Sequence, residues 1–233
     1  MPSYPLELPE SILSSTQPSY QVRIRAPTPS AIVSQIWHQM GVILSASSCL
    51  SWIAGVIQQK ESKLIDKLES RPFEPGNLCI LPYFSGERTP HNNPNAQGVF
   101  LGLKHEHGSF EMTQAVLEGV AYAFGDCQKV LLEAGAEIGE VSLIGGGSRS
   151  RLWGQILASV LNRPLNRHEG SELGPAQGAA RLAMLAAEQG SLEQICTRPK
   201  ISEVLEPRPS LVMHYQEKQE QYRKIYRSLE NFF

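Results

Sequence analysis

The stretch LIGGGSRSRLW, residues 143–153, places three consecutive glycines between an apolar segment and an expected helix. The apolar residues 141–144 predict a buried strand, and residues 151–161 carry apolar side chains at helical spacing. Because each glycine costs backbone entropy on folding, we expect the backbone either to turn tightly here or to be approached closely by a ligand. Such a turn directs backbone N–H groups and the positive end of the helix dipole at whatever lies above it, which favours a phosphate or a nucleotide.

Two other interpretations of the glycine turn stay open at this level. Gly145 and Gly147 match the first two glycines of the dinucleotide fingerprint, although Ser150 stands at the third position. Glu169 lies about where that fingerprint places a carboxylate, so a nicotinamide enzyme is one alternative. The turn could also be purely structural, with Ser148 or Ser150 as the N-cap of the helix. The local pattern does not decide among these interpretations.

The composition is typical of a folded domain without a strongly charged partner. With 233 residues and 41% hydrophobic content, the chain can bury a core. The formal net charge of -2 leaves no global basic field for nucleic acid or anionic lipid. Four cysteines without a C-x-x-C pair indicate neither a disulfide framework nor a zinc site, and residues 41–57 are too short and too polar to cross a bilayer. We therefore expect a cytoplasmic protein without a nucleic-acid, membrane or metal partner.

The rest of the chain predicts alternating helices and strands. Residues 1–36 are rich in Pro, Ser and Thr and are expected to be irregular, with one short strand near 20–26. From Trp37 to Lys60, small and apolar residues on nearly all faces predict a buried helix. The following elements are expected further along: a helix over 61–71, strands over 78–81 and 99–103, a helix from Met112 to Leu131 capped by Ser109, a strand over 163–169, a helix over 172–190 and an amphipathic helix over 213–231.

The helix expected over 172–190 has a face of alanines, which predicts close packing of one backbone against another. The alanines of this face are Ala176, Ala179, Ala180, Ala183 and Ala187. Strands and helices alternate from residue 141 onward, and this order argues for an α/β layer architecture.

Other candidate groups carry weaker signals. His91, His105 and His107 lie in expected loops without a framework of carboxylates or thiolates, so a metal site is not indicated. Glu87 and Arg88 in SGERTPHNNP form either a binding loop or a mutually paired turn. The two aspartates of the chain, at 66 and 126, do not follow strands in glycine-rich loops. A kinase built on this chain would therefore take its proton-accepting aspartate from elsewhere.

Several motifs together resemble the FGGY carbohydrate kinases. Residues 98–123, GVFLGLKHEHGSFEMTQAVLEGVAYA, resemble the second signature of that family. GERTPHNNPNAQGVF, residues 86–100, is similar to the corresponding loop of the xylulose kinases among them. IGGGSRSRLWGQILASVLNRPL at 144–165 resembles their adenosine motif, and GPAQGAARLA at 174–183 the helix that follows it. The resemblance runs from about Trp37 to the C-terminus and favours the kinase interpretation over the dinucleotide fingerprint.

The resemblance implies an α/β, ribonuclease H-like domain of the actin, sugar kinase and Hsp70 type, with a mixed sheet flanked by helices. It also implies ATP or ADP as ligand, Mg²⁺ as cofactor and transfer of the γ-phosphoryl group to D-xylulose. Gly145, Gly146 and Gly147 would lie against adenine and ribose, where a Cβ would clash, and Ser150 would offer its hydroxyl to the base. The site would be completed by Ser148, by Arg149, which either covers the base or points to solvent, and by a substrate or interlobe loop of Glu87, Arg88 and Thr89.

The same resemblance implies that part of the enzyme is absent. The sugar-binding N-terminal lobe, both phosphate loops and the catalytic aspartate would precede Trp37, so we expect no catalytic residue and no metal ligand in this chain. Residues 1–36 are expected to be a leader unlike the family, and 37–233 the C-terminal, ATP-binding lobe. The alternative is a nucleotide-binding or interaction module without chemistry, and association into a homodimer stays open.

Overall fold

The computed structural model describes residues 22–25 and 37–233 and arranges their strands in three small sheets. In the sheet next to the glycine turn, the strand order is β5-β6-β7, with β5 and β6 parallel and β6 and β7 antiparallel. This is the mixed sheet flanked by helices that the sequence predicts. The two-stranded sheets pair β1 (Val22–Arg25) with β2 (Trp37–Met40) and β3 (Cys79–Leu81) with β4 (Val99–Leu101), both antiparallel, and the third contains β5 (Val141–Leu143), β6 (Leu165–His168) and β7 (Ile201–Leu205).

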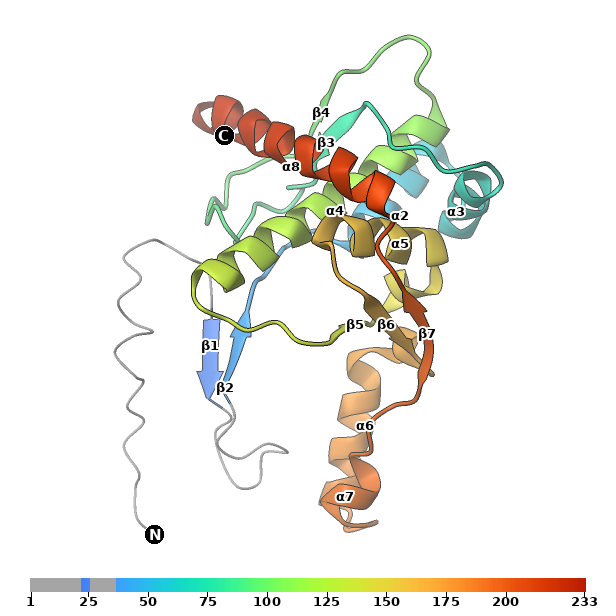
Figure 1. Cartoon of the computed structure of the whole chain (residues 1–233), viewed down its shortest axis with the longest axis vertical. Helices are drawn as coiled ribbons and strands as arrows, with labels where there is room; N and C mark the ends of the chain where they lie inside the picture. Colours follow the sequence, from blue (N-terminus) through green and yellow to red (C-terminus); the bar gives the residue numbers. More distant parts are fainter. Residues whose placement is uncertain (1–21, 26–36) are drawn as a thin grey trace.

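Helices form one packed body above this mixed sheet. In Figure 1, α2, α4, α5 and α8 gather in the upper part of the molecule, whereas α6 and α7 extend away from it below the sheet. The helices are α2 (Ser47–Ile57), α3 (Glu61–Glu69), α4 (Ser109–Glu133), α5 (Arg151–Leu161), α6 (Pro175–Ala186), α7 (Leu192–Ile195) and α8 (Pro209–Leu229), with short 3-10 helices η1 (Gly146–Arg149), η2 (Ser171–Leu173) and η3 (Glu230–Phe232). None of the helices in the described part of the chain is both long and apolar enough to pass through a membrane.

Helix α4 is the centre of the core because its apolar residues recur at helical spacing and are fully buried. Val116, Leu117 and Val120 are 0% exposed. The indole N–H of Trp153 donates to the Leu117 carbonyl at 3.1 Å and so ties α5 to α4. This helix confirms the prediction drawn from its periodicity.

The N-terminus of α4 differs from the prediction. Gly108 is the N-cap, and its backbone N–H donates to the Glu111 carboxylate at 2.8 Å. Ser109, expected as the cap, is the first helical residue, and its hydroxyl accepts from the Lys67 ammonium at 2.8 Å. The Glu111 carboxylate thus supplies the reciprocal half of a capping box, since it accepts from the N-cap N–H, while glycine has no side chain to supply the other half.

Buried polar groups fix the C-terminal helix α8 on α4. The Glu118 carboxylate, 1% exposed, accepts from the Tyr215 hydroxyl at 3.1 Å, and the Asp126 carboxylate lies 2.6 Å from the guanidinium of Arg223. Burial raises the pKa of both Glu118 and Asp126, while these partners act in the opposite direction. The amphipathic helix expected over 213–231 is thus confirmed, although it begins earlier, at Pro209.

One expected element and one expected packing surface are wrong. Residues 37–60 do not form one helix, because 37–40 pair as β2 with 22–25 and the helix begins only at Ser47. Pairing with a distant strand overrides a local pattern of small and apolar residues. The alanine face of α6 does not pack either, because no residue of this helix is buried within the described structure. The leader expected over 1–36 lies outside the described residues except at 22–25, where β1 confirms the short strand.

Candidate nucleotide site

The glycine turn begins with a backbone conformation that favours glycine. Gly145 has a φ of +89°, in the region that L side chains rarely adopt. Residues 146–149 then form η1, and Ser150 caps α5 by accepting from the Trp153 backbone N–H at 3.1 Å. The structural interpretation of Ser150 as N-cap is therefore confirmed.

A second turn, formed by η2 and its flanking residues Gly170 and Gly174, is bonded to the glycine turn. The Gly145 N–H donates to the Ser171 carbonyl at 2.8 Å, and the hydroxyls of Ser148 and Ser171 lie 3.2 Å apart. Gly174 also needs glycine, since its φ is +51° and a Cβ there would lie 3.4 Å from Cα of Gly145. The two turns therefore hold each other rigidly at the end of the mixed sheet.

A pocket of about 630 Å³ opens between this turn and helices α2 and α3. Lining side chains come from both helices, while α5 contributes the buried ring of Trp153. A Cβ on Gly146 would meet nothing within 4 Å, and one on Gly147 would lie 3.3 Å from the Trp153 ring. The lining residues are Ser47, Leu50, Ser51, Lys60, Glu61, Ser62, Ile65, Asp66, Glu69, Gly146, Gly147, Arg149, Ser150 and Trp153.

Four of the six residues predicted from the glycine motif line this pocket, and the other two shape the turn without lining the pocket. Gly146, Gly147, Arg149 and Ser150 are lining residues, and Arg149 is exposed at the rim. Gly145 instead provides the positive φ. The sixth residue, Ser148, is 1% exposed and bonded to the second turn, so its role is structural.

The hydroxyl of Ser150 is already engaged within the chain. It donates to the Glu69 carboxylate at 3.1 Å while accepting from the Trp153 N–H. A single hydroxyl proton cannot be given to two acceptors, so Ser150 is not a donor to a base while this bond holds. The Leu152 N–H also donates to the same Glu69 oxygen, at 3.2 Å. Glu69 thus organises the first turn of α5 from a different helix.

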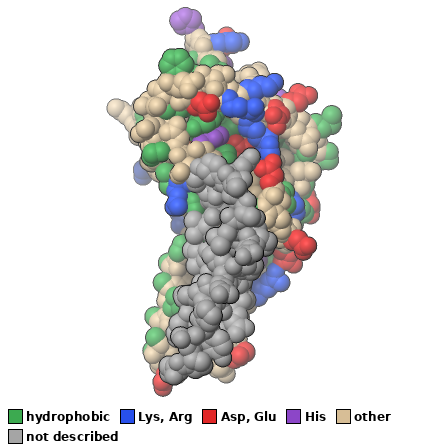
Figure 2. Space-filling model, turned by 90° about the vertical axis from the view of Figure 1, so that its left-hand side faces the viewer, with side chains coloured by type: hydrophobic (Ala, Val, Ile, Leu, Met, Phe, Trp, Pro, Cys, Tyr) green, Lys and Arg blue, Asp and Glu red, His purple; other side chains and the backbone are tan. Residues whose placement is uncertain are grey.

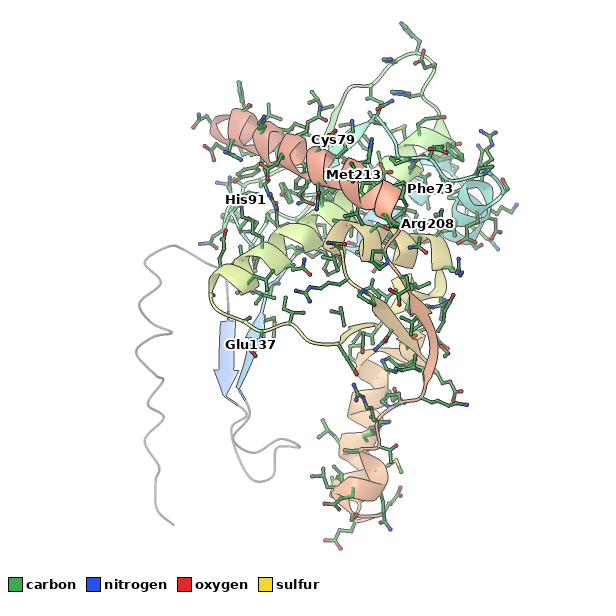
Figure 3. The ribbon with its side chains drawn as sticks, viewed as in Figure 1. Phe73, Cys79, His91, Glu137, Arg208 and Met213 are labelled. Carbon is green, nitrogen blue, oxygen red and sulfur yellow. The ribbon has the colours of Figure 1, made fainter. Side chains whose placement is uncertain are left out.

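The loop of Glu87, Arg88 and Thr89 does not join this pocket. Glu87 and Thr89 are 2% and 1% exposed, and the Thr89 hydroxyl accepts from the Val42 N–H at 2.8 Å. Only Arg88 of the three is exposed. The neighbouring His91 stacks on Tyr226 of α8 with ring centroids 3.5 Å apart, and Figure 3 shows it near the C-terminal end of α8, on the opposite side of the molecule from α3 in Figure 1.

The pocket suits the nucleoside part of a nucleotide better than it suits a metal ion. The open space above Gly146 is what a flat ligand requires, and the largely buried Trp153 ring lies against Gly147 at the back of the pocket. Within residues 22–25 and 37–233, no three Asp, Glu, His or Cys side chains come together in an arrangement that could hold a metal ion. The described residues therefore offer single carboxylates but no cage of three protein ligands, and Mg²⁺ in a kinase would be held mainly by the nucleotide phosphates, by water and by one or two carboxylates.

Sequence reasoning missed the wall formed by α2 and α3. Ser62, Asp66 and Glu69 recur at helical spacing and line the pocket on one face of α3. This spacing identifies a polar face but not what the face looks onto. The carboxylate needed for the dinucleotide interpretation is elsewhere, because Glu169 pairs with Lys200 at 3.5 Å and does not line the pocket.

Charges on the molecular surface are mixed. Figure 2 shows Lys and Arg side chains interspersed with Asp and Glu over the upper body on the visible face. This agrees with the net charge of -2. At the pocket itself, Glu61, Asp66 and Glu69 contribute three carboxylates against the cations of Lys60 and Arg149.

Comparisons with known proteins agree with one another. A model of the FGGY family of carbohydrate kinases, C-terminal domain, matches residues 12–187. The xylulose kinase of Escherichia coli (strain K12) is 42% identical over 197 residues, which are 84% of this chain and 41% of that protein. The xylulose kinase of Klebsiella pneumoniae is 40% identical over 195 residues, 83% of this chain and 40% of that protein. The chain thus spans about two fifths of the length of these relatives.

Solved structures show the same architecture. The crystal structure of a xyloylose kinase from Brucella ovis has a TM-score of 0.75 at 42% identity and covers 84% of this chain and 41% of that one. The Plasmodium falciparum glycerol kinase, solved with ADP, has a TM-score of 0.67 at 20% identity, which shows the fold alone. The fold is therefore the ribonuclease H-like fold of sugar kinases, as predicted. The family match begins at residue 12, inside the segment set apart as a leader, so the boundary at 36 stays a prediction.

Proposed function

Because the chain belongs to the FGGY family of carbohydrate kinases, whose C-terminal domain matches residues 12–187, we propose that it is the ATP-binding lobe of a kinase acting on D-xylulose. The choice of sugar is supported by relatives that are named xylulose kinases at 42% and 40% identity. ATP bound in the complete enzyme supplies the γ-phosphoryl group. A cytoplasmic location belongs to the same proposal.

The observation that carries the proposal is the open space over the glycine turn. Adenine and ribose would lie over Gly146, where a Cβ would meet no protein atom within 4 Å, and beside Gly147, which packs against the Trp153 ring. The braced turn keeps this surface in place before the ligand arrives, so little binding energy is lost in ordering it. The contribution of this chain is therefore to bind and orient the nucleotide.

We further propose that the groups which act on the sugar lie outside the described residues. Asp126 is buried and paired with Arg223, so it is not available to a sugar hydroxyl. Asp66 lies on the helix wall of the nucleotide pocket. Phosphoryl transfer depends on positioning, on metal ions and on a proton acceptor for the sugar hydroxyl. This chain alone is then expected to bind ADP without turning over D-xylulose.

Gly146→Val tests the location of the nucleotide. The valine side chain would enter open space in the pocket without meeting protein atoms, so it should remove ADP binding while the fold stays intact. We expect at least a tenfold weaker Kd for ADP by isothermal titration calorimetry, which corresponds to about 1.4 kcal/mol. Gly139→Val is the matched control, because a Cβ there also meets nothing within 4 Å and the residue is outside the pocket.

Equal loss of ADP affinity in both variants would show that the site is misplaced. Saturable binding of NADH in place of ADP would favour the dinucleotide interpretation. A coupled assay with ATP and D-xylulose adds the catalytic test, since turnover by the chain alone would refute the proposal that its proton acceptor lies elsewhere.

A further inference from the structure

The side chain of Glu69 occupies the N-terminus of α5, although it belongs to α3. Its Oε1 accepts from the Ser150 hydroxyl at 3.1 Å and from the Leu152 backbone N–H at 3.2 Å. Ser150 in turn accepts from the Trp153 N–H at 3.1 Å. Two N–H groups in the first turn of this helix therefore have acceptors within the chain.

This arrangement changes what the glycine turn can attract. A helix N-terminus carries a partial positive charge and binds anions, which is why a strand-to-helix turn suggests a phosphate site. Here the anion at that end is the protein's own carboxylate. A phosphate placed beside the first turn of α5 would approach Glu69 and be repelled by it.

The composition of the pocket agrees with this. Glu61 and Asp66 add two further carboxylates to the lining, and Glu69 is one step along the same face of α3. Ribose hydroxyls and the adenine amino group are hydrogen-bond donors, which carboxylate oxygens accept. The lining thus favours an uncharged group rich in donors over a phosphate.

We propose that Glu69 is a specificity-determining residue, which makes this pocket hold the uncharged adenosine end of the nucleotide and keeps phosphate away from the N-terminus of α5. The inference rests on the proposed nucleotide function, which already places adenosine against the glycine turn, and adds that Glu69 is the group that excludes phosphate there. Adenosine lies inside, between α3 and the glycine turn, and the phosphates point out of the pocket toward the rim.

Calorimetry with adenosine, ADP and inorganic phosphate tests this on the wild-type chain. We expect adenosine and ADP to bind with Kd values within about threefold of each other, and phosphate alone not to bind. ADP binding more than tenfold tighter than adenosine would overturn the role of Glu69, because the pocket would then be holding phosphate. Absence of binding by both adenosine and ADP would overturn the proposed function, and the inference with it.

Glu69→Gln separates charge from geometry. The amide oxygen can still accept from Ser150 and Leu152, so the turn is retained while the negative charge is lost. We expect adenosine affinity to stay within twofold, ADP affinity to rise at least fivefold at low salt, and phosphate binding, absent in the wild type, to become measurable. Adenosine binding that persists with an unchanged ratio of ADP to adenosine affinity would overturn the inference alone and leave the proposed function standing.

Asp66→Asn is the matched control, since it removes a carboxylate from the same pocket wall but not the one bonded to Ser150 and Leu152. A smaller change in the ratio of ADP to adenosine affinity is expected there. An effect equal to that of Glu69→Gln would assign the selectivity to overall pocket charge and not to Glu69. Glu69→Ala, which removes the acceptor as well, should weaken adenosine binding, and rescue by the Gln variant would confirm that the hydrogen bonds position the turn.

Discussion

At the scale of one residue, Glu87 was expected in a substrate or interlobe loop, but it is buried inside the lobe. The side chain is 2% exposed, and its carboxylate accepts from the Arg88 N–H at 2.7 Å. Desolvation raises the pKa of Glu87 to about 8, although hydrogen bonds from the backbone N–H groups of Arg88, Thr89 and Leu44 act in the opposite direction. The residue therefore belongs to the interior of the lobe, and its effect should be on stability.

The raised pKa of Glu87 predicts a pH-dependent free energy of unfolding. Between its ordinary value of 4.5 and about 8, the folded state holds a proton that the unfolded state has lost, so stability falls as pH rises through this window. The loss is at most about 1.4 kcal/mol per pH unit. Urea unfolding from pH 5 to pH 8 should therefore show a flatter pH dependence in Glu87→Gln than in the wild type.

Glu137→Gln is the control for this measurement because Glu137 is exposed. Its pH profile should follow that of the wild type. If Glu87→Gln also retains the wild-type slope, the carboxyl group of Glu87 does not carry the raised pKa.

Single residues also mark how far the site could be predicted from the sequence. The glycines were identifiable because a run of three between an apolar strand and a helix is a local signal, and Ser150 was identifiable as a cap by its place before the helix. Glu69 was not, because it is 81 positions from Ser150 and only the tertiary fold brings the end of α3 to the first turn of α5. Local patterns predict the turn but not the side chain from a distant part of the sequence that bonds to it.

At the scale of elements, the contact of α4 with β3 depends on the absence of a side chain at Gly119. A Cβ there would lie 2.4 Å from Cγ2 of Ile80 and 2.8 Å from its carbonyl oxygen. Gly119→Ala should therefore lower the free energy of unfolding by about 1–3 kcal/mol, because overpacking outweighs the better helix propensity of alanine.

The opposite result is expected on α2. Gly55→Ala meets nothing within 4 Å, so the gain in helix propensity should stabilise the protein by about 0.5–1 kcal/mol. Denaturant titrations of both variants give the comparison. A similar change in both would mean that α4 and β3 are not in such close contact.

Helices and strands could be predicted where the face that is buried in the structure is also the apolar face of the local sequence pattern. The periodicity of α4 and α5 reports faces that are buried within the described lobe. The strand β2 was missed because residues 37–40 are extended by pairing with 22–25, which no helical pattern can reveal. The helix α6 itself was predicted, but the packing expected for its alanine face was not found, because no residue of the helix is buried in the described structure.

At the scale of the whole molecule, the exposed α6 and the length of the relatives belong together. The chain spans 41% of the Escherichia coli xylulose kinase, so most of that enzyme is outside the matched region. All five alanines of the predicted face, Ala176, Ala179, Ala180, Ala183 and Ala187, are exposed. We expect this face to be covered by the part of the kinase that the chain does not span.

This expectation is tested by supplying the N-terminal part of the Escherichia coli xylulose kinase as a separate polypeptide. Turnover of ATP and D-xylulose should appear only when both are present, and Ala180→Glu on α6 should reduce it at least tenfold, because a buried unpaired carboxylate opposes docking. The same variant should keep its ADP affinity and its free energy of unfolding within about 0.5 kcal/mol, as for an exposed site. Ala121→Glu, in contrast, places a charge at a position that is 0% exposed in α4 and should unfold the lobe. If Ala180→Glu supports the same turnover as the wild type, α6 is not part of the surface on which the two halves of the enzyme meet.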